Sequence, residues 1–408
     1  MKNIVESTAS FETWLRSQIE LYEPDLQVKH RKMAENPFEF MRATFYRWAE
    51  VWPERCKALA NTHQVIGVGD LHIENFGTWR DKESRMVWGV NDFDEVHECA
   101  FTVDLVRLAV SVELAAQETR LVDLTFDETC AAVLTGYREG LTSGGRPFVL
   151  ERRNAWLLRL ARAALKEPKV FWKRWLDEKT EPVPSDDDLP AGFREVMRPL
   201  FADSAEIQFR QTKKGADPKG LGSLGHRRLF AYAEWQGGPV GREAKRSCAS
   251  AFLWAAGKPA GRNRIMDFLG AKGRPMSPHV VMKENWLIRP VLAETGRIEP
   301  SELELAAPTR RRALDQERLL EAMAFETANV HLMFSSSQEL KKAASELKLA
   351  ELKRAVAAML DAVHSDFKEW RKHWKTQATK LADGLPKKPV KKGRGTVGSK
   401  KKKVVSSR

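Results

Sequence analysis

The apolar residues of this chain change their spacing several times, and this limits the folds open to it. Residues 9–60, 101–210 and 310–380 carry apolar side chains at helical spacing. Residues 63–94 and the stretch after Lys219 instead carry short apolar runs separated by polar turns, which is typical of β-strands. Because helices and hairpins fall in separate blocks, we expect an α+β protein with a helix-rich part and a small antiparallel β part.

The same changes of pattern divide the chain into five predicted segments. These are an N-terminal helical segment (1–60), a segment with the first strands and further helices (61–210), a β segment (211–295), C-terminal helices (296–382) and a disordered basic tail (383–408).

The basic charge of the chain is concentrated at its C-terminal end. The whole chain carries a formal charge of +13, and residues 386–408 hold ten of its Lys and Arg side chains and no acidic one, so the rest carries only +3. This Pro-, Gly- and Lys-rich stretch cannot form a core, and the simplest interpretation is a solvated, disordered end. It would allow weak contact with nucleic acid or an acidic surface.

Other features of the composition favour a cytoplasmic protein. No apolar run is long enough to span a membrane, and the first twenty residues lack the apolar region of a signal peptide. The four cysteines are scattered without metal-ligand spacing, and we expect reduced thiols, mostly in the core.

The first motif with chemical meaning is a glycine-started loop. Asp70 and Asn75 lie five residues apart after Gly69. This spacing can present a general base and a metal-binding amide from one turn. We predict Asp70 and His72 as catalytic residues and Asn75 as a metal ligand. An ordinary turn capped by Asp70 is the alternative.

The second motif is Asp92-Phe93-Asp94, which follows a short apolar strand. Magnesium prefers oxygen ligands and takes one or two protein carboxylates. We predict Asp92 as a ligand of Mg²⁺, and Asp94 as a ligand of a second ion or as a brace of the loop.

A third motif, at residues 220–225, is rich in glycine and is followed by a strand pattern. Because no helix follows, a dinucleotide-binding turn is disfavoured, and a loop whose backbone N–H groups hold phosphates fits better. Arg242 or Lys245, on a probable strand about twenty residues on, would supply a positive partner. A surface hairpin is the alternative. The predicted nucleotide-binding residues are Gly220, Gly222, Ser223, Gly225, Arg242 and Lys245.

Together these motifs resemble those of the bacterial domain of unknown function 2252 family. The resemblance rests on residues 36–42, 69–77, 91–95, 104–108 and 220–225 and covers roughly residues 30–340. That family has no established substrate, so the resemblance implies kinship without implying a reaction.

The same residues also resemble the catalytic half of aminoglycoside-phosphotransferase and choline-kinase-like enzymes of the protein-kinase-like superfamily. This resemblance implies a two-lobed fold that uses ATP and Mg²⁺. Asp70 would be the base, Asn75 and Asp92 the metal ligands, and Asp104 the residue that braces the loop. In those enzymes the glycine loop and lysine precede the catalytic loop, whereas here they follow it. Either the chain is circularly permuted, or the glycine motif is unrelated.

The resulting hypothesis is a kinase-like phosphotransferase or nucleotidyltransferase whose acceptor, a small molecule or a protein, is unknown. Two departures favour a different hypothesis, a nucleotide-binding pseudokinase or regulatory module without turnover. The lysine position is shared between Arg242 and Lys245, and no partner glutamate follows near residues 262–269. Two further hypotheses are a nucleic-acid-associated protein that acts through its tail, and metal-assisted hydrolysis by Asp70, His72, Asp92 and Asp94.

Overall fold

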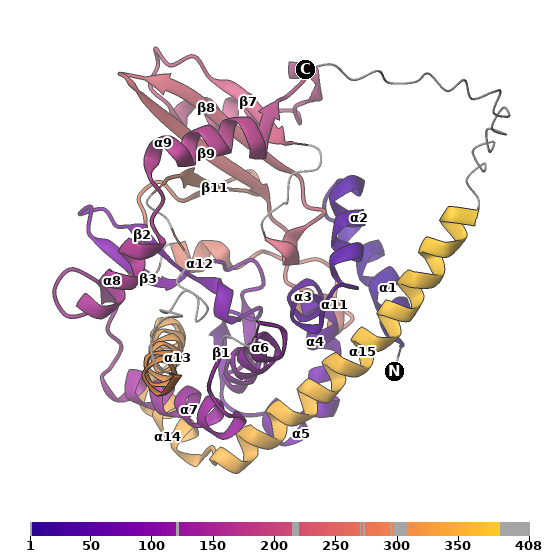
Figure 1. The fold of residues 1–408 in the computed structure, drawn as a ribbon, viewed down its shortest axis with the longest axis vertical. Helices are drawn as coiled ribbons and strands as arrows, with labels where there is room; N and C mark the ends of the chain where they lie inside the picture. The colour runs from indigo at the N-terminus through magenta and orange to yellow at the C-terminus, as the bar shows by residue number, and fades with distance from the viewer. Residues whose placement is uncertain are drawn as a thin grey trace, which may run out of the picture.

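The computed structural model of the chain combines helices with antiparallel sheets, which confirms the α+β class (Figure 1). It describes residues 2–119, 122–213, 220–269, 271, 274–293, 296 and 309–383. The predicted basic stretch, residues 386–408, lies outside the described residues.

The N-terminal part is helical, as its apolar spacing predicts. Asn36 begins the third helix, and its side-chain oxygen accepts a hydrogen bond from the Glu39 N–H at 2.8 Å. Pro37 occupies the first helical position, where a missing N–H costs nothing. The helices are α1 (Ile4–Arg16), α2 (Glu23–Lys32), α3 (Pro37–Ala43), α4 (Phe45–Arg55) and α5 (Lys57–Ala60).

Short strands follow and carry the first two motifs. Two of the short apolar runs form a hairpin with Phe76 opposite Val90, and Asp81 closes its turn by accepting hydrogen bonds from the N–H groups of Glu83 and Arg85. A second strand pair lies before and after this hairpin in the chain. The strands are β1 (Gln64–Gly67), β2 (Phe76–Arg80), β3 (Met86–Val90), β4 (His97–Ala100) and β5 (Phe148–Val149), where β1 pairs with β4, and β3 pairs with both β2 and β5.

Further helices connect these strands to the larger sheet. The longest of them, α6, is buried along most of its length. The helices are α6 (Thr102–Thr119), α7 (Phe126–Thr142), α8 (Ala155–Ala164), α9 (Pro168–Arg174), a π-helical turn (Trp175–Lys179) and α10 (Phe193–Met197).

The larger sheet is antiparallel throughout, in the order β10-β11-β9-β8-β7-β6. It includes strands that lie before residue 211. The hairpin turns at Gln236-Gly237 and Glu284-Asn285 all have positive φ, as two-residue turns between twisted strands require. The strands are β6 (Thr180–Pro182), β7 (Gln208–Thr212), β8 (Arg228–Trp235), β9 (Gly238–Arg246), β10 (Val281–Lys283) and β11 (Trp286–Val291).

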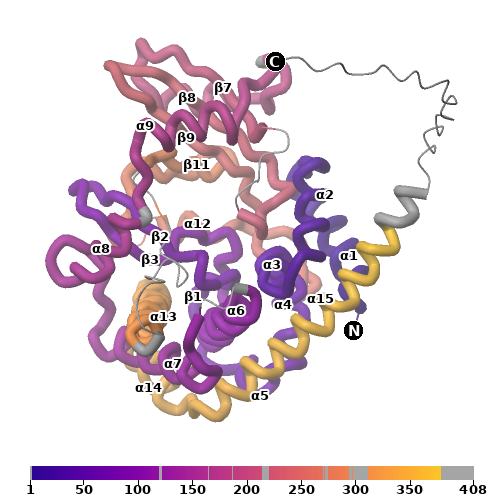
Figure 2. The backbone as a smooth tube through the Cα atoms, in the orientation of Figure 1, coloured from indigo at the N-terminus to yellow at the C-terminus, as the bar shows by residue number. Residues whose placement is uncertain are grey.

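Each face of this sheet is covered by its own apolar cluster. Phe193 and Met197 of α10 pack on the face that carries Leu229 and Ala244. On the opposite face, Trp175 packs against Phe230 and Val291. The sheet therefore has a core of its own, and Figure 2 shows it above the helical part.

The helical part is completed by the C-terminal helices, so it is built from both ends of the chain. α13 packs along α7, and α15 crosses α6 and the N-terminal helices (Figure 1). These helices are α11 (Ala251–Ala255), α12 (Ile265–Leu269), α13 (Thr309–Leu332), α14 (Ser337–Glu346) and α15 (Leu349–Asp383).

Among the described residues, no helix has the length and apolar character needed to cross a membrane. Three of the four cysteines are buried and Cys248 is partly buried, and all four are free thiols.

Candidate active site

The loop that carries Asp70 is fixed by one buried carboxylate. The N–H groups of Val68 and Gly69 donate to the two oxygens of Asp104, at 2.7 and 2.8 Å. Gly69 has a φ of +81°, and a Cβ there would lie 2.6 Å from the Glu95 carbonyl oxygen, so only glycine fits this path. Asp104 thus braces the loop that carries Asp70.

Asp104 is itself held by a buried histidine and tyrosine. His331 Nε2 lies 2.9 Å from Asp104 Oδ2, and His331 Nδ1 lies 2.8 Å from the Tyr137 hydroxyl; all three residues are fully buried. Burial raises the pKa of Tyr137 well above its usual value, so its hydroxyl stays protonated and can donate to Nδ1. Nε2 then carries the proton that bonds Asp104.

Asp70 faces a buried arginine that sequence reasoning missed. The Nε of Arg107 donates to Asp70 Oδ1 at 2.9 Å, and its Nη2 contacts the same oxygen and donates to the Met41 carbonyl at 2.9 Å. The guanidinium lies 5.0 Å from the Phe45 ring centroid and 4.8 Å from that of Trp48. The available signal was its place one helical turn after Asp104, as a lone cation among apolar residues.

Arg107 contacts only one of the two Asp70 oxygens. Both contacts go to Oδ1, and the Asp70 side chain keeps 18% of its exposure. Burial raises the pKa of Asp70 above its usual value, although the Arg107 charge opposes this shift. A carboxylate held at Oδ1, with Oδ2 turned elsewhere, is suited to accept a proton.

Asn75 joins the first motif to the second. Its amide nitrogen donates to the carbonyl oxygens of Asp70 and Asp92, both at 3.1 Å. Its oxygen accepts the Asp92 N–H at 2.9 Å and keeps a second lone pair. The structure therefore brings the two motifs together.

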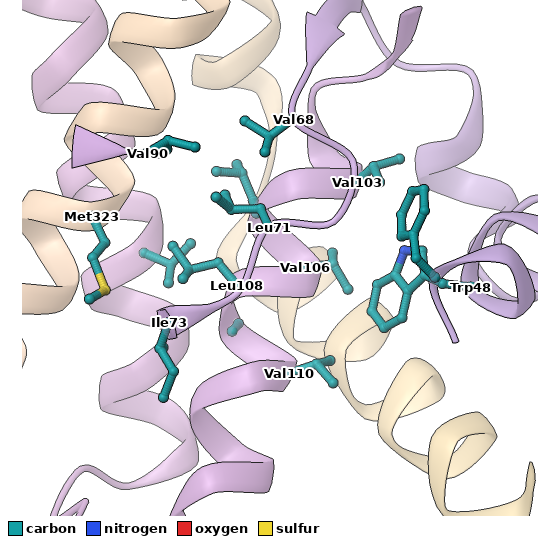
Figure 3. Close-up of a cluster of buried hydrophobic side chains, with 14 of the residues drawn as sticks. Trp48, Val68, Leu71, Ile73, Val90, Val103, Val106, Leu108, Val110 and Met323 are labelled. Atoms are coloured by element: carbon teal, nitrogen blue, oxygen red, sulfur yellow. The ribbon is translucent and has the colours of Figure 1, made fainter. Parts of the chain in front are cut away.

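Apolar packing and an ion pair hold the loop from below. Leu71 is fully buried and Ile73 nearly so, and Figure 3 shows both beside Leu108 of α6. Glu74 forms an ion pair with Arg42 at 2.7 Å, and this pair connects the loop to the end of α3. His72 is also buried.

The carboxylates of the second motif meet Lys245 of β9. Its Nζ contacts Asp94 Oδ2 and lies 3.5 Å from Asp92 Oδ1, and only 1% of the lysine side chain is exposed. Burial alone would raise the pKa of Asp92, but Lys245, Arg289 and Arg228 outweigh it and hold this pKa below its usual value. Burial and the Asp92 charge raise the pKa of Asp94. Two carboxylates and a lysine from distant segments thus form one cluster.

The donor set of this cluster fits Mg²⁺. The Oδ1 atoms of Asp92 and Asp94 are buried and accept no hydrogen bond within the described structure. Oxygen atoms of this kind, with Asn75 Oδ1 nearby, are suitable ligands for a hard cation that keeps several waters. A closed protein cage would need three or more His, Cys, Asp or Glu side chains grouped around the metal. No such group occurs among the described residues.

The glycine segment, residues 220–225, lies against the Asp70 loop. A Cβ on Gly222 would be 3.2 Å from Asp70 Oδ2 and 3.3 Å from the Arg42 carbonyl oxygen. Lys29 Nζ donates to the Gly222 carbonyl at 2.7 Å, and the Tyr22 N–H donates to the Gly225 carbonyl at 2.7 Å. A residue with a Cβ at position 222 would crowd the Asp70 carboxylate, which would have to shift by a few tenths of an ångström to accommodate it.

The other residues predicted in this segment have structural contacts. Gly220 and Gly225 have φ of +79° and +98°, which favours glycine at both positions. Ser223 Oγ accepts a hydrogen bond from Arg228 Nη2 at 3.3 Å.

Of the two candidate cations on β9, only Lys245 lies in the cluster. Arg242 is three residues away, so it projects from the opposite face of the strand. Its guanidinium lies 5.6 Å from the Phe201 ring centroid, beside the α10 cluster. The structure thus places Arg242 apart from Asp92 and Asp94.

Comparison with known proteins gives one match. Residues 22–169 match the model of a family described as "Uncharacterized protein conserved in bacteria (DUF2252)". This match supports the predicted family for the part of the chain that holds both acidic motifs. No curated protein and no solved structure matches the chain.

Proposed function

We propose that this chain is a Mg²⁺-dependent phosphotransferase of the kinase-like class, with a nucleoside triphosphate as donor. The observation that carries the proposal is the meeting of two parts of the site that are distant in the chain. Lys245 contacts Asp92 and Asp94, and Gly222 lies beside Asp70, although about 150 residues separate the two halves in the chain.

The arrangement of the larger sheet supports the proposal. In protein kinases a glycine-rich loop covers the nucleotide phosphates and a lysine on the third strand reaches them. Here the glycine segment connects β7 to β8, and Lys245 lies on β9, the next strand in both chain and sheet. Because this sheet follows the acidic motifs in the chain, the proposed fold is circularly permuted.

In the proposed reaction, Asp70 accepts the proton of the acceptor hydroxyl through Oδ2. Arg107 fixes Oδ1 and orients the carboxylate, while Asn75 sets its distance from Asp92. Asp92 and Asp94 would hold Mg²⁺, which neutralises charge on the phosphate oxygens when bound. Lys245 would turn from the carboxylates toward the phosphates.

Transfer with water as acceptor gives a direct test, because the natural acceptor is unknown. We expect ATP with Mg²⁺ to raise the melting temperature, and label from γ-labelled ATP to appear as phosphate. Asp92→Ala should abolish the melting shift. Asp70→Asn, which keeps an oxygen for Arg107, should retain the shift and lose the transfer.

Each result has a distinct meaning. No melting shift at millimolar nucleotide would refute the proposal. Full transfer by Asp70→Asn would refute the role of Asp70 as base. Release of pyrophosphate, with the label of α-labelled ATP recovered in AMP, would identify nucleotidyl transfer instead. A melting shift without any transfer in the wild type would favour a nucleotide-binding module without turnover.

A further inference from the structure

Two arginines that sequence reasoning did not select lie on the same face of the sheet as Lys245. Directly paired residues of antiparallel strands share a face. Lys245 pairs with Arg228 of β8, and Glu243, two residues earlier on β9, pairs with Arg289 of β11. These four side chains therefore occupy adjoining positions on the face that meets Asp92.

Glu243 links the two arginines. Its Oε1 lies 2.8 Å from Arg228 Nη1, and its Oε2 lies 3.9 Å from Arg289 Nη2. The three side chains are partly buried, with 14%, 19% and 26% exposure for Arg228, Glu243 and Arg289. Burial would raise the pKa of Glu243, but Arg228, Arg289 and Lys245 hold it below its usual value, so it stays ionised.

Each arginine also contacts one of the predicted motifs. Arg228 Nη2 donates to Ser223 Oγ in the glycine segment at 3.3 Å. Arg289 Nη1 donates to the carbonyl oxygen of Asn91, the residue before Asp92, at 3.2 Å. Within the described structure these contacts engage Nη1 and Nη2, which carry two N–H groups each, so both arginines retain donors that can bind an anion.

We propose that Arg228 and Arg289 bind the phosphate chain of the nucleotide together with Lys245, and that Arg242 does not. This inference rests on the proposed function and names the recognised group, a polyphosphate. Adjacent strands lie about 4.8 Å apart, so a row of cations across β8, β9 and β11 spans roughly 10 Å. A single phosphate reaches only part of this row, whereas a triphosphate extends along it.

Glu243 also contributes to the charge balance of this cluster. Lys245, Arg228 and Arg289 balance the charges of Asp92, Asp94 and Glu243, so the cluster needs no bound ion to be neutral. A polyphosphate without metal adds negative charge beside three carboxylates. Loss of the Glu243 charge should therefore strengthen binding of a metal-free polyphosphate, whereas loss of either arginine should weaken it.

The test measures binding of inorganic tripolyphosphate, orthophosphate and Mg·ATP to the full chain by calorimetry. For the wild type we expect tripolyphosphate to bind at least tenfold more tightly than orthophosphate. Arg228→Gln and Arg289→Gln should each weaken tripolyphosphate binding at least tenfold. Arg242→Gln, the matched control from the opposite face of β9, should change it less than twofold, and Glu243→Gln should strengthen it without metal.

Circular dichroism melts check that each variant is folded. A further control is Arg228→Lys, which keeps the charge but loses the planar guanidinium, and it should give an intermediate affinity. Unchanged tripolyphosphate and Mg·ATP binding in both glutamine variants would overturn this inference while the proposed function stands. Arginine-dependent tripolyphosphate binding with no affinity for Mg·ATP would overturn the proposed function and leave the polyphosphate site. Absence of both in the wild type would overturn both.

Discussion

The two sides of the candidate site differ in what holds them in place. On the Asp70 side, the N–H groups of Val68 and Gly69 bond Asp104, and the Asn75 amide bonds two carbonyl groups. On the Lys245 side, the ammonium group of Lys245 contacts the carboxylates of Asp92 and Asp94.

This difference has a mechanical meaning. Hydrogen bonds to backbone groups fix the path of a loop, and breaking one leaves a buried polar group unsatisfied. Ion pairs between side chains can exchange partners while the backbone stays in place. The backbone of the Asp70 side is therefore fixed, as the proposed base requires, whereas the Lys245 side depends on charged side chains that the proposed ligand would rearrange.

The largest expected effect comes from Asp104→Asn. An asparagine keeps one oxygen, so at least one buried donor among Val68 N–H, Gly69 N–H and His331 loses its acceptor. We expect a loss of about 3–5 kcal/mol in the free energy of unfolding, measured by urea denaturation.

A surface acid provides the control for this comparison. Asp127, whose side chain is 71% exposed, pairs with Lys353. Asp127→Asn should cost less than about 1 kcal/mol. If the two substitutions had equal effects, the rigid description of the Asp70 side would be wrong.

A smaller effect, on metal affinity, is expected for Lys245→Met. Without the ammonium group, a cation no longer competes for Asp92 and Asp94. We expect Mn²⁺ alone to bind about ten- to hundredfold more tightly to this variant than to the wild type at pH 7.5. Paramagnetic resonance of Mn²⁺ measures both affinities. Lys283→Met, on the edge strand β10, is the matched control. Equal Mn²⁺ affinities of the wild type and both variants would show that Lys245 does not compete with a cation for Asp92 and Asp94.

The smallest expected effect is a pH dependence from His226, which follows the glycine segment. Burial, and then the charges of Lys29 and Lys245, lower its pKa from 6.5 to about 3, and its Nδ1–H donates to the Arg246 carbonyl at 3.1 Å. Below pH 6.5 the unfolded chain binds a proton here and the folded chain does not. The free energy of unfolding therefore decreases as the pH is lowered.

His226→Asn removes this group and sets the reference. From pH 7.5 to 5.5, the wild type should lose about 1.4 kcal/mol more unfolding free energy than the variant, as measured by urea denaturation at each pH. Parallel pH profiles would show that folding does not keep His226 unprotonated.

Local patterns were sufficient to predict the elements that carry the first two motifs. The hairpin before Asp92 is such an element, because its strands and its turn depend on residues close in the chain. Such features depend on turn and capping preferences that act over a few residues.

The partners of the site residues depend on packing and could not be predicted in this way. Arg242 and Lys245 are both plausible on a strand, and only the pairing of β9 with β8 and β11 decides which faces Asp92. His331 lies 227 residues after Asp104, and no local pattern records that separation.

The hydrogen bond between Asp104 and His331 also has a consequence for the order of folding during synthesis. The loop appears early in synthesis, while the histidine that completes its anchor emerges only when α13 is made. Residues 180–291 lie between them and form a sheet with apolar clusters of its own. Because domains with their own cores fold as units, the sheet can form on the ribosome first, and the proposed base acquires its final position among the last events of folding.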